Sequence, residues 1–304
     1  MWNERTLRWW VITRDAVHLW LDANAFTYAG ALAFYTLFSL APVVIIAVTV
    51  IGVVLGEDAA HGQIVAQLQD VMGQEAAAAV EQAVARSRIE ESGLLPTLLG
   101  VAALVAGATT VFGQMQLSLN AIWGVAARPK RNTVLALVMS RLLSLTVVLA
   151  IGFVLLVSLL AGVLLRAVLE FTDQFAPAVA TLLSGADLLL SLLSVALLFA
   201  AIFKVLPDVV LRWRDVAVGA LVTALLFSFG RYGIAAYLAH TATASTYGAA
   251  GSVVLILLWV YYSSLILLFG AAFTKSHLLA RGGVVVPRNT AVLVRRELVT
   301  ESAA

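Results

Sequence analysis

The sequence contains no cysteine and has few charged residues. None of its 304 residues is Cys, so disulfides, thiolate metal sites and cysteine nucleophiles are excluded. Only 12% of the residues are charged, against about a quarter in typical soluble domains, whereas 62% are apolar and the mean hydropathy is +0.99. A water-soluble fold cannot bury such an apolar excess without leaving large apolar surface patches. We therefore expect an integral membrane protein.

The motifs of common enzyme classes are missing as well. The sequence has no Walker loop, Rossmann glycine fingerprint, His-Glu-x-x-His motif or nucleophile elbow. We expect no enzymatic activity, no cofactor and no metal. The net charge of +2 and the pI of about 9.0 are explained by basic residues next to a membrane, so nucleic-acid binding is not expected. Charges within residues 1–22 interrupt any apolar core there, so we expect no cleavable signal peptide.

Long apolar runs dominate what is present. A helix needs roughly 20 residues to cross the hydrocarbon core of a bilayer, and its backbone must be satisfied internally. Six runs meet this requirement, near residues 31–55, 94–117, 139–165, 179–204, 216–238 and 250–273. The sequence therefore predicts an all-α polytopic membrane protein with six transmembrane helices in one domain, residues 1–280.

Lysine and arginine are distributed unevenly between the predicted connections. Alternate sides of the membrane carry 14 and 3 of these residues. The basic side faces the cytoplasm in membrane proteins. We expect both termini in the cytoplasm of a bacterial-type inner membrane, with the lipid bilayer as the main partner. The oligomeric state stays open.

Three connecting segments have a pattern of their own. Residues 1–22 resemble an amphipathic helix on the inner interface, because Trp9, Ile12, Ala16 and Trp20 share one stripe. The first outer loop, 56–93, is too long to lack structure and is expected to form short amphipathic helices. Residues 281–304 lose the pattern and are expected to be a partly mobile cytoplasmic tail.

Several motifs occur in order along the chain. They are Ala29-Gly30-Ala31-Leu32-Ala33-Phe34-Tyr35 with Ser39-Leu40-Ala41-Pro42, Ser118-Leu119-Asn120-Ala121-Ile122-Trp123, Leu206-Pro207-Asp208, Tyr247-Gly248-Ala249-Ala250-Gly251, and Trp259-Val260-Tyr261-Tyr262-Ser263 with Leu268-Phe269-Gly270-Ala271. With them the chain resembles the YihY / virulence factor BrkB family of inner-membrane proteins over about residues 10–280. The resemblance implies a membrane protein of poorly defined activity.

Members of that family were once labelled ribonuclease BN, and the histidines argue against a nuclease here. A metal-dependent nuclease needs clustered histidine and carboxylate ligands. The predicted topology places His18 and His277 on one side of the membrane and His61 and His240 on the other. They cannot converge on one metal ion, so we expect no ribonuclease activity.

Two charged residues lie deep in predicted spans. Asp187 in the fourth and Arg231 in the fifth each lie about eight residues from the outer end, which is about 12 Å at the helical rise. Ionisable groups within a membrane are costly and often functional. We hypothesise that the two side chains approach each other in the bundle interior. The alternatives are a purely structural lock between helices or an arginine that snorkels outward.

Polar residues elsewhere in the spans are further candidates for a substrate pathway. Asn24, Tyr28, Tyr35 and Ser39 fall within about 60° of one another on a helix, and Pro42 follows as a candidate hinge. Gln116 and Asn120 are four residues apart at the inner end of the second span. They could bind a solute, or cap and anchor the helix. Tyr261 lies mid-span in the sixth helix, where aromatic residues are unusual.

Two functions remain open from the sequence. The first is a transporter or permease-like protein for a small solute, ion or lipid, which the polar residues within the spans favour. The second is a non-enzymatic protein of envelope maintenance or regulation, with the outer segment 56–93 as its partner-binding face.

Overall fold

The computed structural model describes residues 4–55, 69, 77–78, 110–128, 177–240 and 249–294. Its helices are α1 (Glu4–Asp22), α2 (Ala25–Leu55), a helix over residues 110–123, α7 (Pro177–Val205), α8 (Trp213–His240) and α10 (Ala249–Ala280). Two short strands complete it, β1 (Val125–Ala127) and β2 (Ala291–Leu293).

The predicted helices agree with the structure wherever it describes them. The runs 31–55, 179–204, 216–238 and 250–273 lie in α2, α7, α8 and α10. The end of the second run lies in the 110–123 helix. Residues 94–109 and 139–165 lie outside the described residues, as does nearly all of the segment 56–93. A largely helical protein is confirmed, and the number of spans stays a prediction.

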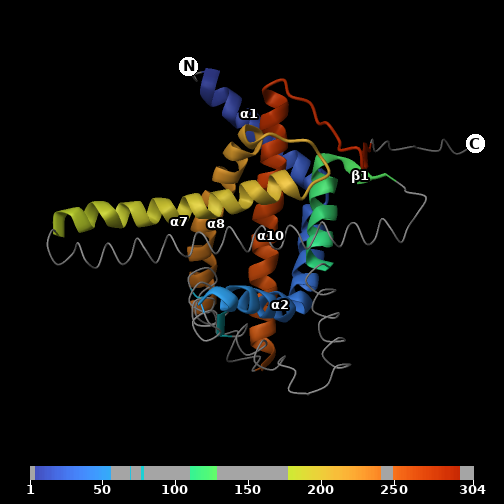
Figure 1. Ribbon diagram of the computed structural model, residues 1–304. Coiled ribbons are helices and arrows are strands. Elements are labelled where there is room, and N and C mark those ends of the chain that lie inside the picture. Colours follow the sequence, from blue (N-terminus) through green and yellow to red (C-terminus); the bar gives the residue numbers. More distant parts are fainter. Residues whose placement is uncertain are drawn as a thin grey trace, which may run out of the picture.

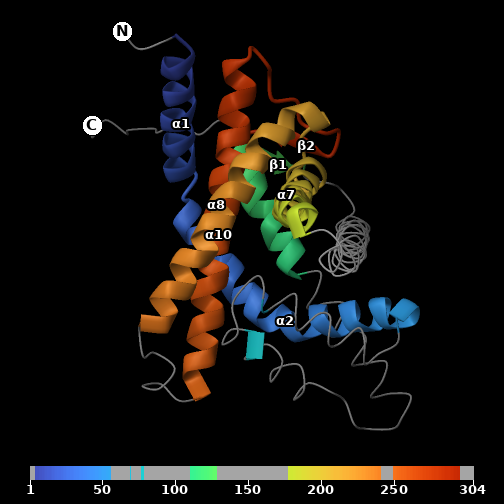
Figure 2. The same ribbon diagram turned by 90° about the vertical axis from the view of Figure 1, so that its left-hand side faces the viewer.

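Helix α10 runs through the centre of the described structure. It contacts α1, α2 and α8, and α7 packs on α8. Figure 1 shows α7 crossing in front of α8 and α10 and projecting to one side, while Figure 2 views it nearly along its axis. Both views show α2 changing direction part-way along its length. Pro42 lies within this helix and lacks the amide proton for a helical hydrogen bond, which accounts for a bend there.

Among the described residues, two helical stretches are long and apolar enough to cross a membrane. They are Trp213–Gly233 and Val253–Ala280, with mean hydropathies of 1.5 and 2.3. Ala25–Leu40 and Leu189–Val205 are shorter apolar stretches. By composition and length, α8 and α10 are thus suited to lipid surroundings.

The amphipathic N-terminal helix is present and packs along α10. Ile12 and Ala16 are buried against Phe273, and the ring of Trp9 stacks on that of Phe273 with centroids 6.3 Å apart. The indole of Trp20 donates a hydrogen bond to the carbonyl of Leu265. The predicted stripe therefore packs on protein and fixes α1 to α10.

Helices α8 and α10 approach each other through a reciprocal pair of glycines and threonines. A Cβ atom on Gly219 would overlap Oγ1 of Thr274, and one on Gly270 would overlap Oγ1 of Thr223. Each hydroxyl donates a hydrogen bond to the glycine carbonyl four residues earlier in its own helix, at 2.6 Å in α8 and 2.7 Å in α10. Both hydroxyls are thus satisfied within a close, small-residue helix contact.

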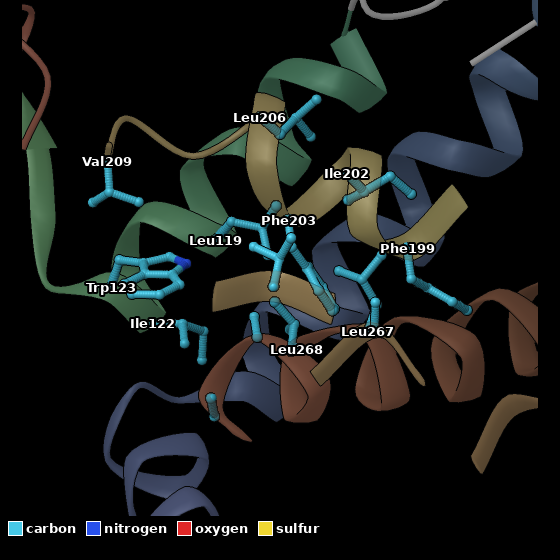
Figure 3. Packing of buried hydrophobic residues seen from close by; sticks show 14 of the residues in the cluster. Leu119, Ile122, Trp123, Phe199, Ile202, Phe203, Leu206, Val209, Leu267 and Leu268 are labelled. Carbon is cyan, nitrogen blue, oxygen red and sulfur yellow. The ribbon is translucent and has the colours of Figure 1, made fainter. Parts of the chain in front are cut away.

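An apolar core joins the 110–123 helix to α7 and α10. Figure 3 shows its central side chains, which converge from these helices and from the turn after α7. They are Leu119, Ile122, Trp123, Phe199, Ile202, Phe203, Leu206, Val209, Leu267 and Leu268. The core lies beside the residues that form the cavity described below.

The chain after α10 folds back onto the rest of the structure. β2 pairs antiparallel with β1, with Ala126 opposite Val292, and Val209 bridges Pro287. The all-α prediction missed this small sheet. Residues up to 294 of the expected tail pack against the protein, and 295–304 lie outside the described residues.

Candidate solute-binding cavity

A cavity of about 480 Å³ opens where the α1–α2 junction, the 110–123 helix, β1 and α10 meet. This volume falls in the range of small-molecule sites. Polar and apolar side chains share its wall, together with the backbone of β1. The wall is formed by Leu19, Asp22, Ala23, Tyr28, Gly113, Gln116, Leu117, Asn120, Ala121, Ile122, Gly124, Val125, Ala126, Ala127, Asp208, Lys275 and Val294.

Asn120 and Asp208 form the best-defined polar contact of the cavity. Nδ2 of Asn120 donates to Oδ2 of Asp208 at 2.8 Å, and the backbone N–H of Asp208 donates to Oδ1 of Asn120, also at 2.8 Å. This pairing sets the orientation of the amide, because a flipped amide would place like groups together at both contacts. Both residues are buried.

Gln116 extends this contact by one helical turn. Its Nε2 donates to the same Oδ2 of Asp208 at 3.2 Å, since residues four apart lie on one helix face. Oδ1 of Asp208 accepts no hydrogen bond from the residues that the structure describes. Because Asp208 lines the cavity, this oxygen can accept a hydrogen bond from a bound molecule.

Lys275 brings a positive charge to the same cavity. Its Nζ donates to the carbonyl of Ile122 at 2.9 Å, at the C-terminal end of the 110–123 helix, where a cation is favoured by the helix dipole. An ammonium has three N–H donors, so two remain. Within the described residues the ion pair is that of Arg14 and Asp15, so Lys275 and Asp208 are not joined directly.

The turn that carries Asp208 is held from both sides. Arg288 donates its backbone N–H to the Asp208 carbonyl at 2.9 Å and its guanidinium to the Lys204 carbonyl at 3.1 Å. Lys204 donates to the Leu211 carbonyl and lies 5.0 Å from the Trp213 ring centre. Asp208 thus has a fixed backbone on which its carboxylate is positioned.

The structure brings three of the predicted pathway residues together. Gln116, Asn120 and Tyr28 all line the cavity. The other members of the predicted span-one stripe lie in different surroundings. Asn24 lies between α1 and α2 with a φ of 56°, Tyr35 is exposed, and Ser39 is buried and donates to the Thr36 carbonyl at 3.2 Å.

Tyr261 and Arg231 are not among the residues that line the cavity. Tyr261 packs against the apolar core. Arg231 donates to the hydroxyl of Tyr232 at 3.2 Å, with its guanidinium 5.0 Å from that ring centre. Asp187 belongs to α7, and its side chain lies outside the described part of the chain. The predicted approach of Asp187 and Arg231 therefore stays a prediction.

Sequence reasoning missed Asp208 and Lys275 as site residues. Asp208 follows a proline, and from the sequence either Asp208 or Asp215 could cap the next helix. The structure has Asp215 in that role, since its carboxylate accepts the Arg212 N–H at 2.9 Å. Lys275 was considered only in the count of lysine and arginine residues on the cytoplasmic side. The Leu206-Pro207-Asp208 motif was the available signal, because a carboxylate in a short turn between two apolar helices needs a hydrogen-bond donor from another part of the chain.

The histidines of the described region lie outside this wall. His277 is buried and stacks on Trp9 with ring centroids 5.7 Å apart, whereas His18 is exposed on α1. The described residues include no group of three His, Asp or Glu side chains that could hold a metal ion. The contacts of the cavity are thus those of amide, carboxylate, ammonium and phenol groups.

Comparison with known proteins assigns the chain to a family. The family model of Virulence factor BrkB matches residues 16–283. The chain belongs to this family. All of the cavity-lining residues except Val294 lie within the matched range, so the site belongs to the BrkB domain itself. The resemblance seen in the sequence motifs is confirmed.

Curated relatives within the family are described as membrane proteins. The chain is 29% identical to a UPF0761 membrane protein of Stenotrophomonas maltophilia over 267 residues, which are 85% of this chain and 59% of the relative. A UPF0761 membrane protein of Tolumonas auensis is 38% identical over 76 residues, 25% of each chain. The chain thus spans at most about three fifths of these relatives. No solved structure matches it. The BrkB family and the apolar helices together identify an integral membrane protein.

Proposed function

We propose that this BrkB-family protein is a permease-like membrane protein that binds a small polar solute in the cavity and moves it across the bilayer. The observation that carries the proposal is the presence of Asp208 and Lys275 in one cavity without a direct ion pair between them. Unpaired charges in a partly buried place are costly. A bound solute that meets them offsets this cost.

The charge distribution supports a position for this cavity in the membrane. The 110–128 region, the turn at Asp208 and the segment after α10 belong to connections rich in lysine and arginine, which the positive-inside rule assigns to the cytoplasm. We therefore propose six spans in the inner membrane with both termini inside, and place the cavity at the inner mouth of the solute route.

The deeper part of the route follows from the remaining polar residues. Helix α2 carries the cavity-lining Tyr28 and also contains Pro42, and its change of direction supports a hinge within the same helix. Asp187 and Arg231 would form the outer part of the route. This function involves no covalent chemistry, and we propose that the protein is not an enzyme.

The alternative of an envelope-maintenance or regulatory protein relies on a different part of the chain. Its proposed partner-binding face is the outer segment 56–93, of which only residues 69 and 77–78 are described. The described geometry favours the permease, because it provides a cavity with free charged groups.

A flux screen in reconstituted vesicles tests the proposal. Purified protein is incorporated into liposomes, and uptake of labelled rubidium, chloride, phosphate and a mixture of amino acids is compared with protein-free liposomes. We expect uptake of at least one of these solutes. The variants Asn120→Ala, Asp187→Asn and Arg231→Ala should lower it, because each removes a polar contact on the route.

Asp15→Asn is the matched control, since Asp15 lies on the exposed face of α1 and pairs only with Arg14 among the described residues. It should transport as the wild type does. Uptake equal to that of protein-free liposomes for every solute, with correctly folded protein, would remove the permease function.

A further inference from the structure

We infer that the cavity binds a zwitterion, and specifically a neutral α-amino acid with an apolar side chain. The inference rests on the proposed function in that it names the solute of the same site. Its basis is the presence of two opposite charges in the wall of one cavity without an ion pair between them. Asp208 and Lys275 both line the wall, and they do not form an ion pair.

Each charged group is held in place by hydrogen bonds to the protein and can still form further hydrogen bonds with a ligand. Oδ2 of Asp208 accepts from Asn120 and Gln116, so the carboxylate is held in place while Oδ1 accepts no hydrogen bond from the described residues. Nζ of Lys275 is held by the Ile122 carbonyl and retains two N–H donors. An ammonium group fits the first and a carboxylate the second, through charge-assisted hydrogen bonds.

A ligand with both groups gives Asp208 and Lys275 each a direct counter-charge, which a ligand with one charged group cannot do. A simple cation would leave Lys275 without a counter-charge, and a simple anion would leave Asp208 without one. Asp22, at the exposed rim, adds a negative charge that attracts the ammonium end. Tyr28 also lines the wall, and its side chain carries a hydroxyl that can donate a hydrogen bond.

The rest of the wall favours an apolar body on the ligand. Leu19, Leu117, Val125 and Val294 line the cavity together with alanines of β1. The volume of about 480 Å³ leaves room for a branched side chain beside the two charged groups. Leucine combines these features, so it is the probe of choice.

The test measures binding to the whole protein in detergent micelles, without a membrane gradient. Thermal unfolding is followed in the presence of L-leucine, of 3-methylbutylamine, which lacks the carboxylate, and of 4-methylpentanoate, which lacks the ammonium. We expect leucine to raise the midpoint of unfolding, and the two analogues to bind about tenfold or more weakly, since each loses a charge-assisted contact.

Two variants test the assigned residues. Lys275→Gln and Asp208→Asn should each weaken leucine binding by about tenfold or more. Lys275→Gln should not weaken the binding of 3-methylbutylamine and should strengthen it to some degree, because that ligand has no group for Lys275 and the variant removes a like charge. Asp15→Asn is the control, because Asp15 lies outside the cavity wall and pairs with Arg14 on the surface, and it should bind leucine as the wild type does. The selective response of Lys275→Gln cannot arise from general unfolding.

The outcomes separate this inference from the proposed function. Equal binding of leucine and either analogue, or no effect of leucine, overturns the amino-acid assignment and leaves the flux screen to decide the permease function. Tighter binding of phosphoethanolamine than of leucine overturns it too, and assigns the site to a lipid headgroup. Leucine binding without flux in vesicles would support the ligand assignment and contradict the permease function.

Discussion

Asn120 and Asp208, 88 residues apart in the sequence, exchange two hydrogen bonds of 2.8 Å each. The side chain of Asn120 contacts both the carboxylate and the backbone amide of Asp208. It therefore joins the 110–123 helix to the turn after α7 while it positions the carboxylate at the cavity. One residue pair thus serves both the fold and the candidate site.

The first prediction concerns this pair. Asn120→Ala leaves the buried carboxylate with Gln116 as its remaining side-chain donor, and we expect a loss of about 1–3 kcal/mol. Asn120→Asp should cost more, because it places a second carboxylate against Asp208. Thermal unfolding of the detergent-solubilised protein measures both. Gln114→Ala on the same helix is the control, and an Asn120→Asp protein as stable as wild type would contradict the assigned contact.

The second prediction concerns the contact between α8 and α10. Gly219→Ala and Gly270→Ala each place a methyl group against a threonine hydroxyl of the facing helix, and overpacking of this kind costs on the order of 1–3 kcal/mol. Gly113→Ala is the matched control, because a Cβ there meets nothing within 4 Å. Replacing glycine by alanine in an open helical position should stabilise by about 0.5–1 kcal/mol.

Rescue tests the same contact from the other side. Thr274→Ala removes the Oγ1 atom that a Cβ on Gly219 would overlap. The double variant Gly219→Ala/Thr274→Ala should therefore recover part of the loss, whereas Gly219→Ala/Thr223→Ala should not. Equal recovery in both would show that the two pairs do not act separately.

The helices of this protein could be predicted from sequence because each depends on a local property. An apolar run long enough for a bilayer predicts a helix without knowledge of its neighbours, and α2, α7, α8 and α10 follow those runs. The stripe of Ile12 and Ala16 likewise predicted the buried face of α1. The small sheet was missed because each strand is three residues long and pairs with a segment far away in the chain.

The candidate site could be predicted only in part for the same reason. Gln116 and Asn120 share a helix face by spacing alone, and both line the cavity. Asp208 and Lys275 come from separate elements, and their proximity to that face depends on tertiary packing. Asn24 was expected in a helical stripe, but the chain turns there between α1 and α2. A spacing rule holds only while the helix continues.

The third prediction separates two roles for Asn24. Its φ of 56° is left-handed, a conformation that asparagine and glycine tolerate and most other residues adopt at a cost of roughly 1–2 kcal/mol. Asn24→Ala should therefore lower the unfolding midpoint, and Asn24→Gly should not. If Asn24→Gly retains stability but loses vesicle flux, the amide has a role in the solute route. If both are retained, Asn24 serves only the turn.

The fourth prediction uses the absence of cysteine. Ala127 pairs with Ala291 across β1 and β2. The hydrogen bonds from Arg128 to Thr290 and from Val294 to Gly124 alternate along the ladder, so Ala127 and Ala291 form a non-hydrogen-bonded pair, in which side chains are closest. The double variant Ala127→Cys/Ala291→Cys should cross-link under mild oxidation, with no native thiol to interfere.

The register control is Ala127→Cys/Val292→Cys. A shift of one residue turns the second side chain to the opposite face of the strand, so this pair should cross-link far more slowly. Labelling of the remaining thiols with a maleimide polymer before and after reduction gives the extent of cross-linking on a gel. Since β1 and Val294 form part of the cavity wall, rapid cross-linking of the first pair and not the second establishes that the chain after α10 closes this side of the site. Comparable rates for the two pairs would show that β2 does not hold this register.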